Sequence, residues 1–467
     1  MSKETILAHI ILEADSALHF GSGDFDMLYD SPIQRDFNGL PIILGTSICG
    51  VIKANAKGIF SKNELDSLFG SQDFSSRLIF SNALLLDEKM CVSENLIPFS
   101  KLKDSPFLHH FLSLPQRQHN AIDYNGSCKD GAKFDEEVIF KGTRFKCAVS
   151  MDCQSEGCQN NSDKEAFFKI LSLFYSPNIR FGAGSTKGFG KIKAHKITYE
   201  ILQTPFCKSA SLNETLSEHF TPDYSALSTK NFTHYTLNLR ADSVFLFGAG
   251  FGDKEADSIG VSEKIIDYDK GDLSERKLLI PASSIKGALS QRTRFYINKD
   301  LGNFIVAESS QNSELNNKAK QIHATLFGNA ESSDKSTKSQ ATKGKILISD
   351  IYLDFDENKD SHLFAHNSID RFTGGTIDGA LFQERANTSP AFKLDIFVEN
   401  VPNSADFQDS NQKKFFDKAI QSFERALKDI CTSLLPLGAA SSKGHGFFSG
   451  DLEKNGVCLN AQNGEKI

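Results

Sequence analysis

The chain has 467 residues, of which 39% are hydrophobic and 24% charged, so it is a globular protein too long for one ordinary core. Its net charge of −7 argues against a protein that grips nucleic acid over its whole surface, although a local basic groove is compatible with it. No apolar run approaches the roughly 18 residues of a membrane span, and the first residues lack a signal-peptide pattern. We expect a cytoplasmic protein that does not engage a membrane.

Nine cysteines are scattered along the chain without a Cys-x-x-Cys pair, which does not fit a disulfide framework. The tightest group contains Cys147, Cys153 and Cys158. Its spacing differs from that of common zinc fingers and no histidine is close. We therefore expect free thiols and no zinc site.

Five short motifs occur twice in the same order, which indicates a tandem domain duplication. They are Ala-Asp-Ser with Phe-Gly, a helix start, Leu-Phe-Gly, His-Asn-x-Ile-Asp (with Ala or Ser at x) and a glycine-rich loop. They occupy residues 14–21, 45–50, 68–70, 119–123 and 182–190, and again residues 241–248, 282–287, 326–328, 366–370 and 438–446. We expect a first domain over residues 1–202 (copy one), a Ser/Thr-rich linker over 203–233, and a second domain over 234–467 (copy two).

Each copy opens on a predicted strand. In copy two, Tyr235, Leu237 and Leu239 alternate with polar residues, a period of two. A helix follows the second motif, whose Ser and Thr residues we expect to cap it. Further strands are predicted at 78–86 and 345–353, and apolar residues at helical spacing predict a second helix before each glycine-rich loop.

Two strand–helix–strand halves per copy predict an α+β fold with two tandem ferredoxin-like domains. Residues 98–115 and 309–342 are expected to be inserted loops.

The glycine-rich loops are the strongest local feature. Small residues, hydroxyl groups and one lysine let backbone amides approach a phosphate closely. The lysine precedes the last glycines instead of following them, so the loop is not a Walker P-loop. We expect phosphate contacts from Gly182, Gly184, Ser185 and Lys187, and from Ser441, Lys443 and His445.

Two other groups of polar residues are candidates for contacts with nucleic acid. Serines at a helix amino end suit a phosphate, and nearby cations suit a groove that tracks a backbone; these are Ser47, Lys53, Ser283, Ser284, Lys286 and Arg292. The His-Asn-x-Ile-Asp motifs carry groups that bond to bases and riboses; these are His119, Asn120, His366, Asn367 and Arg371.

These motifs resemble the RAMP superfamily, specifically the backbone subunits of type III CRISPR effectors. The resemblance rests on residues 20–23, 30–36 and 39–47 of copy one, on residues 280–287 and 369–374 of copy two, and on both glycine-rich loops. The fusion is similar to the double-RAMP subunits of subtype III-D complexes. The resemblance implies two RRM-like domains, each with a thumb β-hairpin. The thumbs would include residues 124–138 and 374–389.

In that family an aspartate between the Phe-Gly and Gly-Leu-Pro motifs cleaves target RNA with a divalent metal, and the position maps to Asp30. A carboxylate there would hold hydrated Mg²⁺ or Mn²⁺ beside the scissile phosphate. Copy two departs from the pattern: with Asp267 taken as the equivalent of Asp36, the catalytic position falls on Val261. Asp253 and Asp257 lie in the same loop, and the sequence does not decide between an inactive copy two and either acid.

The function implied is a guide-RNA (crRNA)-binding backbone subunit that acts as a metal-dependent endoribonuclease on guide-bound target RNA. Its expected partners are the guide, a complementary target RNA, other RAMP backbone subunits and the large polymerase/cyclase-like subunit. One alternative is a purely structural backbone subunit. Another is a guide-processing endoribonuclease that recruits His19 or His445 as a general base.

Overall fold

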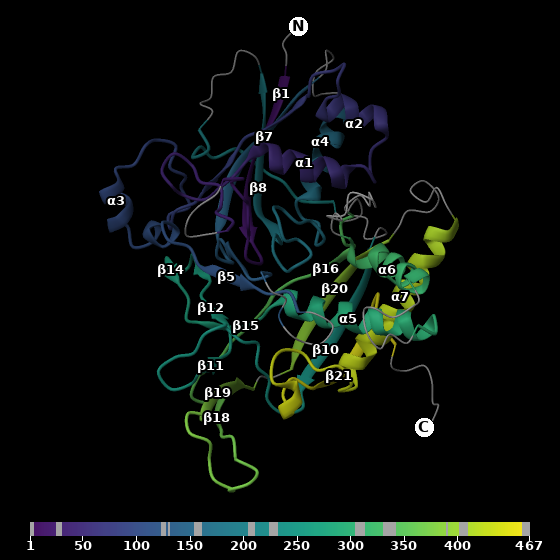
Figure 1. Cartoon of the computed structure of the whole chain (residues 1–467). Coiled ribbons are helices and arrows are strands. Elements are labelled where there is room, and N and C mark those ends of the chain that lie inside the picture. Colours follow the sequence, from purple (N-terminus) through teal and green to yellow (C-terminus); the bar gives the residue numbers. More distant parts are fainter. Residues whose placement is uncertain are drawn as a thin grey trace.

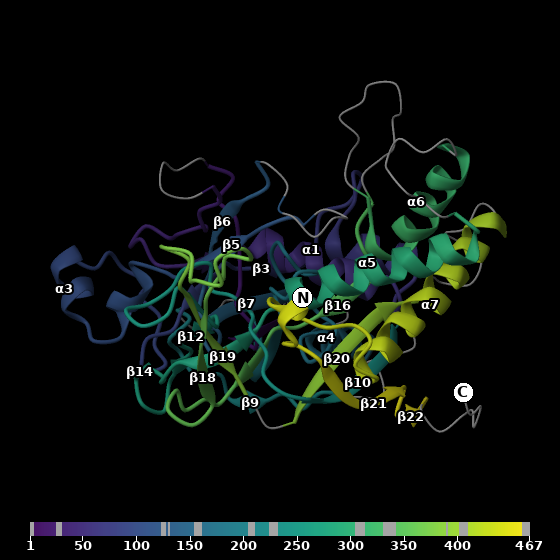
Figure 2. The same cartoon turned by 60° about the horizontal axis from the view of Figure 1, so that its bottom comes forward.

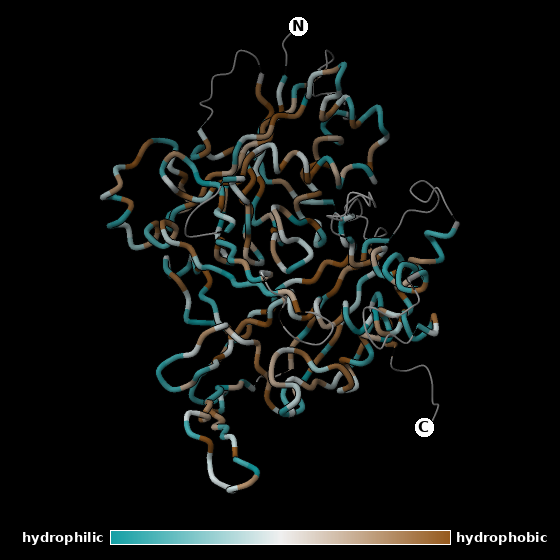
Figure 3. The backbone as a smooth tube through the Cα atoms, in the orientation of Figure 1, coloured by the Kyte–Doolittle hydropathy of each residue, from teal (hydrophilic) through white to brown (hydrophobic). Residues whose placement is uncertain are grey.

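The computed structural model describes residues 4–24, 30–122, 128, 131–153, 161–203, 211–223, 232–303, 313–329, 342–388, 391–400 and 410–459. These residues form two α+β bodies, each with helices packed on an antiparallel sheet (Figure 1). Hydrophobic stretches run along the strands of both sheets (Figure 3). None of the described helices has the length and apolar character needed to cross a membrane.

The sheet of copy one is built around its first strand. Strand β1 (Glu4–Ala14) lies between β7 (Arg144–Asp152) and β8 (Ile192–Gln203), antiparallel to both. Apolar side chains of β1 and β7 alternate into the core, as a half-buried strand requires. The outer strands are β2 (Ile42–Ile43), β3 (Leu78–Phe80), β4 (Ala83–Leu85) and β9 (Glu218–His219).

Three helices cover this sheet: α1 (Gly45–Ala56), α2 (Lys62–Phe69) and α4 (Asn161–Leu173). Helix α2 begins with a capping box between Ser61 and Glu64, which satisfies two otherwise unpaired backbone donors. The expected insertion at 98–115 carries α3 (Phe99–Asp104) and a 3₁₀ turn (Leu108–Phe111), and is anchored by buried Phe107 and Phe111.

Copy two repeats this arrangement. Strand β10 (Phe232–Ala241) lies between β20 (Phe392–Glu399) and β21 (Phe448–Lys454), with β16 (Ile346–Ile348) and β22 (Val457–Cys458) outside them. Its helices are α5 (Ala282–Asp300), α6 (Ser313–Phe327) and α7 (Ser410–Cys431). They gather on one side of the molecule (Figure 2). The predicted tandem α+β fold is confirmed, with β10, β20 and β21 in the places of β1, β7 and β8.

Each copy carries a long-looped β-hairpin outside its main sheet. In copy one, β5 (Gln116–His119) pairs with β6 (Phe134–Glu137); in copy two, β18 (Ser361–His366) pairs with β19 (Phe382–Asn387). The second arms of both hairpins fall in the predicted thumb segments, although residues 124–127, 129–130 and 389 lie outside the described residues. The β18–β19 hairpin projects from the lower end of the molecule (Figure 1).

Short strands complete the region below the β5–β6 hairpin. They are β11 (Ser258–Ile259), β12 (Ser262–Glu263), β13 (Ile266–Asp267), β14 (Asp272–Leu273), β15 (Lys277–Ile280) and β17 (Ile351–Leu353).

Part of the segment expected as a linker packs on copy one. Strand β9 pairs with β8, Phe220 joins the core, and Leu212 packs with Leu86 and Val92. The remaining residues of that segment lie outside the described part of the chain, apart from its two ends.

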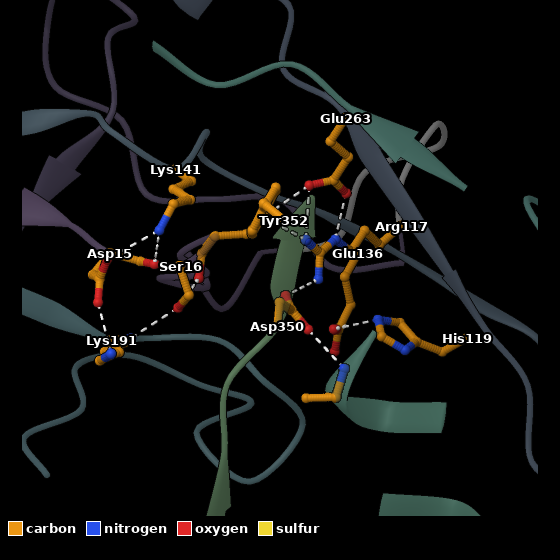
Figure 4. Close-up of polar contacts among 12 residues, drawn as sticks. Asp15, Ser16, Arg117, His119, Glu136, Lys141, Lys191, Glu263, Asp350 and Tyr352 are labelled. Carbon is orange, nitrogen blue, oxygen red and sulfur yellow. Dashed lines mark hydrogen bonds and ion pairs between the residues drawn. The ribbon is translucent and has the colours of Figure 1, made fainter. Parts of the chain in front are cut away.

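The two copies meet at a buried ionic contact (Figure 4). Arg117 of β5 binds Glu263 at 2.6 Å and Asp350 at 2.5 Å, and donates to the Tyr352 hydroxyl at 2.9 Å. Burial by itself lowers the pKa of Arg117, but Asp350 and Glu263 raise it well above its usual range. Gly188 of the glycine-rich loop also touches copy two, since a Cβ there would lie 2.3 Å from Asp350 Oδ1.

Candidate functional site

A His–Glu–Lys cluster joins the hairpin of copy one to its glycine-rich loop. Glu136 of β6 lies 3.1 Å from His119 Nε2 and 3.4 Å from Lys187 Nζ (Figure 4 shows Glu136 and His119). Lys187 and His119 also contact the ring of Phe134. Burial alone would raise the pKa of Glu136, but His119 and Lys187 lower it to about 2. The carboxylate is therefore ionised and holds Lys187 and His119 together beside the hairpin.

Copy two has the same cluster. Glu384 of β19 lies 2.8 Å from His366 Nε2 and 2.9 Å from Lys443 Nζ, and Lys443 lies over the Phe382 ring. Burial opposes ionisation of Glu384, but Lys443 and His366 hold its pKa below the usual value. His445 adds a contact of 3.6 Å to the same carboxylate.

The sequence interpretation missed both glutamates. It placed the histidines and lysines in separate motifs, whereas the structure brings them together around Glu136 and Glu384. A signal was available: the pattern Phe-x-Glu occurs at 134–136 and again at 382–384, after the two His-Asn-x-Ile-Asp motifs.

The acid-bearing loops lie against the second arms of the hairpins in the same way. Asp30 Oδ2 accepts a hydrogen bond from the backbone N–H of Asp135 at 3.0 Å. Asp257 Oδ2 accepts one from the backbone N–H of Gln383 at 2.8 Å. The next residue is also equivalent, because Ser31 bridges Glu136 in parallel as Ser258 bridges Glu384. Asp257 therefore occupies in copy two the place of Asp30 in copy one.

The alignment that placed Val261 at the position of Asp30 was wrong. The Val261 N–H donates to Phe247 O at 2.7 Å, as the Gln34 N–H donates to Phe20 O at 2.6 Å, so Val261 corresponds to Gln34. Counting two residues further, Glu263 corresponds to Asp36. The count failed because copy two inserts the β13–β14 hairpin after Glu263, and Asp267 belongs to that insertion.

Asp253 has a structural role in its loop. Its Oδ1 accepts the backbone N–H groups of Glu255 and Ala256, both at 2.8 Å, and its Oδ2 binds Arg385 at 2.9 Å. These contacts close a turn ahead of Asp257 and leave Asp257 as the acid beside the hairpin.

The serines at the helix starts are not the caps that we expected. The first amide of α1, at Gly45, donates to Asn82 Oδ1, and that of α5, at Ala282, donates to Asp350 Oδ1, each at 2.9 Å. Both caps come from turns distant in sequence, Asn82 between β3 and β4 and Asp350 between β16 and β17, which local pattern reading does not detect. Ser47, Ser283 and Ser284 lie in the first helical turn, where Ser47 and Ser284 are exposed and Ser283 is half-buried.

Close packing explains much of the glycine content of the loops. A Cβ at Gly182, where φ is 80°, would lie 2.3 Å from His19 O, and one at Gly184 would collide with Phe189. Ser185 is buried, and Ser441 is exposed. Lys187 and Lys443 remain partly exposed while they bind their glutamates.

The predicted cations differ in their surroundings. Lys53 donates to Gly70 O at 3.1 Å, Lys286 to Thr186 Oγ1 at 2.9 Å, and Arg292 binds Asp429 at 2.5 Å. These three side chains connect elements of the protein. Beyond the paired hairpin strands, Asn120, Asn367 and Arg371 are exposed.

The His-Asn-x-Ile-Asp hairpin of copy one and the start of α5 face one another across a cavity of about 450 Å³. Its walls include Gln118 and His119 from β5, and Ser283 and Ser284 from α5. Residues predicted separately from the two copies therefore share one cavity.

The two histidines considered as general bases are buried. His19 Nδ1 contacts Glu137 O at 2.7 Å and its Nε2 contacts Ser31 Oγ at 2.9 Å. His445 packs against Phe364. Neither imidazole is exposed enough to act as a general base on a substrate at the surface.

Among the described residues, no three His, Cys, Asp or Glu side chains converge in a way that would hold a metal tightly. A single carboxylate suits Mg²⁺, which keeps several waters and takes further ligands from substrate phosphates. Asp30 and Asp257 fit that donor set because both are exposed at the base of a hairpin. Cys147 is a buried free thiol; Cys153 is disulfide-bonded, contrary to our expectation; and Cys158 lies outside the described residues.

Comparison with curated proteins finds no match to this chain. One similar solved structure is described as "Cryo-EM structure of the Type III-B Cmr-beta bound to cognate target RNA". It is 14% identical, with a TM-score of 0.30, and the match covers 42% of this chain and 61% of that one. The family model of the RAMP superfamily matches residues 11–193 and 238–449, one region in each copy. The chain therefore belongs to the RAMP superfamily.

Proposed function

We propose that this protein is a guide-RNA-binding backbone subunit of a type III CRISPR effector complex, and that it cleaves guide-bound target RNA at Asp30 and Asp257. The observation that carries the proposal is the matched pair of hydrogen bonds from these carboxylates to the hairpin arms. Because each copy has an acid bonded to its own hairpin, each copy would make one cut in the target RNA.

The hairpin of copy two supports the role of a wedge. Its tip exposes apolar side chains: Phe372 is 99% exposed, and Ile369 and Leu381 are also largely exposed. Apolar wedges inserted between base steps unstack them and distort the nucleic acid. A nucleotide displaced beside the hairpin would lie near Asp257.

Cleavage at that nucleotide follows from the position of the acid. The ribose 2′-oxygen attacks the adjacent phosphorus, an O2′–P bond forms, and the P–O5′ bond breaks, with the 2′ proton lost to solvent and a proton gained by the leaving 5′-oxygen. A Mg²⁺ or Mn²⁺ ion bound at the carboxylate would neutralise the charge that develops on the phosphate. Asp30 and Asp257, held by the hairpin N–H groups, would keep the positive charge of that ion beside the distorted nucleotide.

The remaining candidates suit a surface that grips RNA by its backbone. Lys187 and Lys443 stand at the hairpin bases, and Arg371 lies on the copy-two tip. Contacts of this kind read phosphates and shape and leave sequence to base pairing. The guide, a complementary target, other RAMP subunits and the large polymerase/cyclase-like subunit are the partners of this proposal.

The burial of His19 and His445 disfavours the guide-processing alternative. The following experiment distinguishes the proposed function from that of a purely structural backbone subunit. The chain is coexpressed with a guide and the other subunits, and the purified particle is given a labelled complementary RNA with and without Mg²⁺. We expect short RNA to copurify and Mg²⁺-dependent cuts to appear. An RNA-free chain that stays apart from the other subunits would contradict the proposal.

A further inference from the structure

A second cavity lies next to Asp257 and belongs to copy two alone. It has a volume of about 600 Å³, within the range of small-ligand pockets. Its wall includes Ile259 of β11, two residues beyond Asp257, together with Phe251, Phe355, Arg276 and Asn387. Five of its residues also line the cavity between the copies, so the two spaces share a wall.

The lining combines the groups that recognise a nucleobase. Phe251 is 64% exposed, and half-buried Phe355 supplies a second ring. Unstacked bases bind proteins by stacking on aromatic rings and by hydrogen bonds along their edges. Arg385 binds Asp253, Glu255 and Glu357, whereas Arg276 donates to Ser262 and forms no ion pair with a described residue.

Asn387 provides the second sign of a ligand. It is 3% exposed, and its Oδ1 accepts no hydrogen bond from any described residue. A buried amide oxygen without a partner is costly, and such groups are commonly satisfied by a bound molecule or water.

Copy one lacks these groups. Phe245 bridges Asn387 as Leu18 bridges Ile139, so an isoleucine stands at the position of Asn387. Gly248 bridges Gly260 as Gly21 bridges Ile33, which places Asp24 at the position of Phe251. The pocket is therefore a feature of copy two and is not repeated in copy one.

We propose that this cavity is a binding site for one unpaired RNA base, stacked on Phe251, with Asn387 in the cavity wall. The inference rests on the proposed function, because the base would belong to the RNA strand that passes Asp257. Its consequence is that the copy-two site holds its substrate more tightly than the copy-one site and favours single-stranded over duplex RNA.

The test uses the full chain and a fluorescein-labelled ten-nucleotide oligouridylate, with binding followed by anisotropy. Phe251→Ala should weaken binding by roughly tenfold, the loss typical of one stacked base. The control is Phe74→Ala, an equally exposed phenylalanine of copy one (68%), which should bind as the unaltered chain does. The same variants are compared on a blunt RNA duplex. Phe251→Ala should not change the affinity for this duplex, because the bases of the duplex are paired and stacked on one another.

A second measurement does not depend on affinity. Oligouridylate carrying 4-thiouridine is photocrosslinked to the chain, and the attached residue is identified by mass spectrometry; we expect Phe251 or Phe355. If the chain binds the RNA but Phe251→Ala has no effect and crosslinks map elsewhere, the pocket is refuted and the proposed function stands. If the chain binds no RNA, either alone or assembled with its guide, both the pocket and the proposed function are refuted.

Discussion

Asp257 accepts the backbone N–H of Gln383 at 2.8 Å, and this one contact aligns the acid loop of copy two with that of copy one. The equivalent contact of Asp30 is at 3.0 Å. Because both bonds fix a carboxylate to the second arm of a hairpin, any displacement of the hairpin carries the acid with it. The acid and the wedge behave as one unit in each copy.

The contact between the copies should depend strongly on Arg117. Its partner Asp350 is fully buried, so Arg117→Met would leave two acids without a counter-charge. Removing one partner of a buried ion pair costs about 3–5 kcal/mol. We expect a loss of that size in the free energy of unfolding, measured by urea denaturation. Arg371→Met, at an exposed arginine, should change it by less than about 0.5 kcal/mol. Equal effects of the two substitutions would show that the junction does not stabilise the chain.

Alanine substitutions at two equivalent glycines distinguish the effect of backbone strain from the effect of contact between the copies. Gly188 and Gly444 have φ of 113° and 90°, so alanine is strained at both. A Cβ at Gly188 would also collide with Asp350, whereas nothing lies within 4 Å of one at Gly444. Gly188→Ala should therefore lower the melting temperature clearly more than Gly444→Ala. Indistinguishable melting temperatures would argue against the close approach of the copies.

Asp15 should make the stability depend on acidic pH. Burial opposes its ionisation, but Lys141 and Lys191 lower its pKa from 3.8 to about 2 (Figure 4). A lowered pKa in the folded state gives stability that is complete above about pH 4 and lost as the pH falls towards 2. Asp15→Asn should cost about 1–2 kcal/mol at pH 7 and much less near pH 2. The check is the free energy of unfolding from pH 7 to 2. Asp73→Asn, at an exposed acid, is the control and should follow the unaltered chain throughout.

The lysines at the hairpin bases should carry part of the RNA affinity. Each phosphate contact contributes about one counterion to the salt dependence, so Lys443→Ala should reduce the slope of log affinity against log salt by about 1. Lys428→Ala is a matched control because Lys428 is an exposed lysine on α7, a helix that carries none of the candidate RNA contacts. Equal slopes for all three chains would remove Lys443 from the RNA surface.

The duplication and the α+β fold could be predicted because repeated motifs and alternating apolar residues are local signals. The helix caps could not, since Asn82 and Asp350 reach the helix starts from turns later in the chain. The equivalence of Asp257 with Asp30 was hidden by the inserted β13–β14 hairpin, which shifts any count made from Asp267. Glu136 and Glu384 each bind a histidine and a lysine because the two strands of each hairpin pair. The sequence predicted the thumb segments but not which residues pair within them.

The central claim is that both copies cleave, each through the acid at its hairpin base. The most direct measurement is the map of cuts that complexes containing Asp30→Ala, Asp257→Ala or the turn control Asp253→Asn make in an end-labelled, guide-bound target RNA. Each of the first two should abolish one cut and keep the other, and Asp253→Asn should keep both. Retention of every cut in the Asp30→Ala and Asp257→Ala complexes would contradict the account.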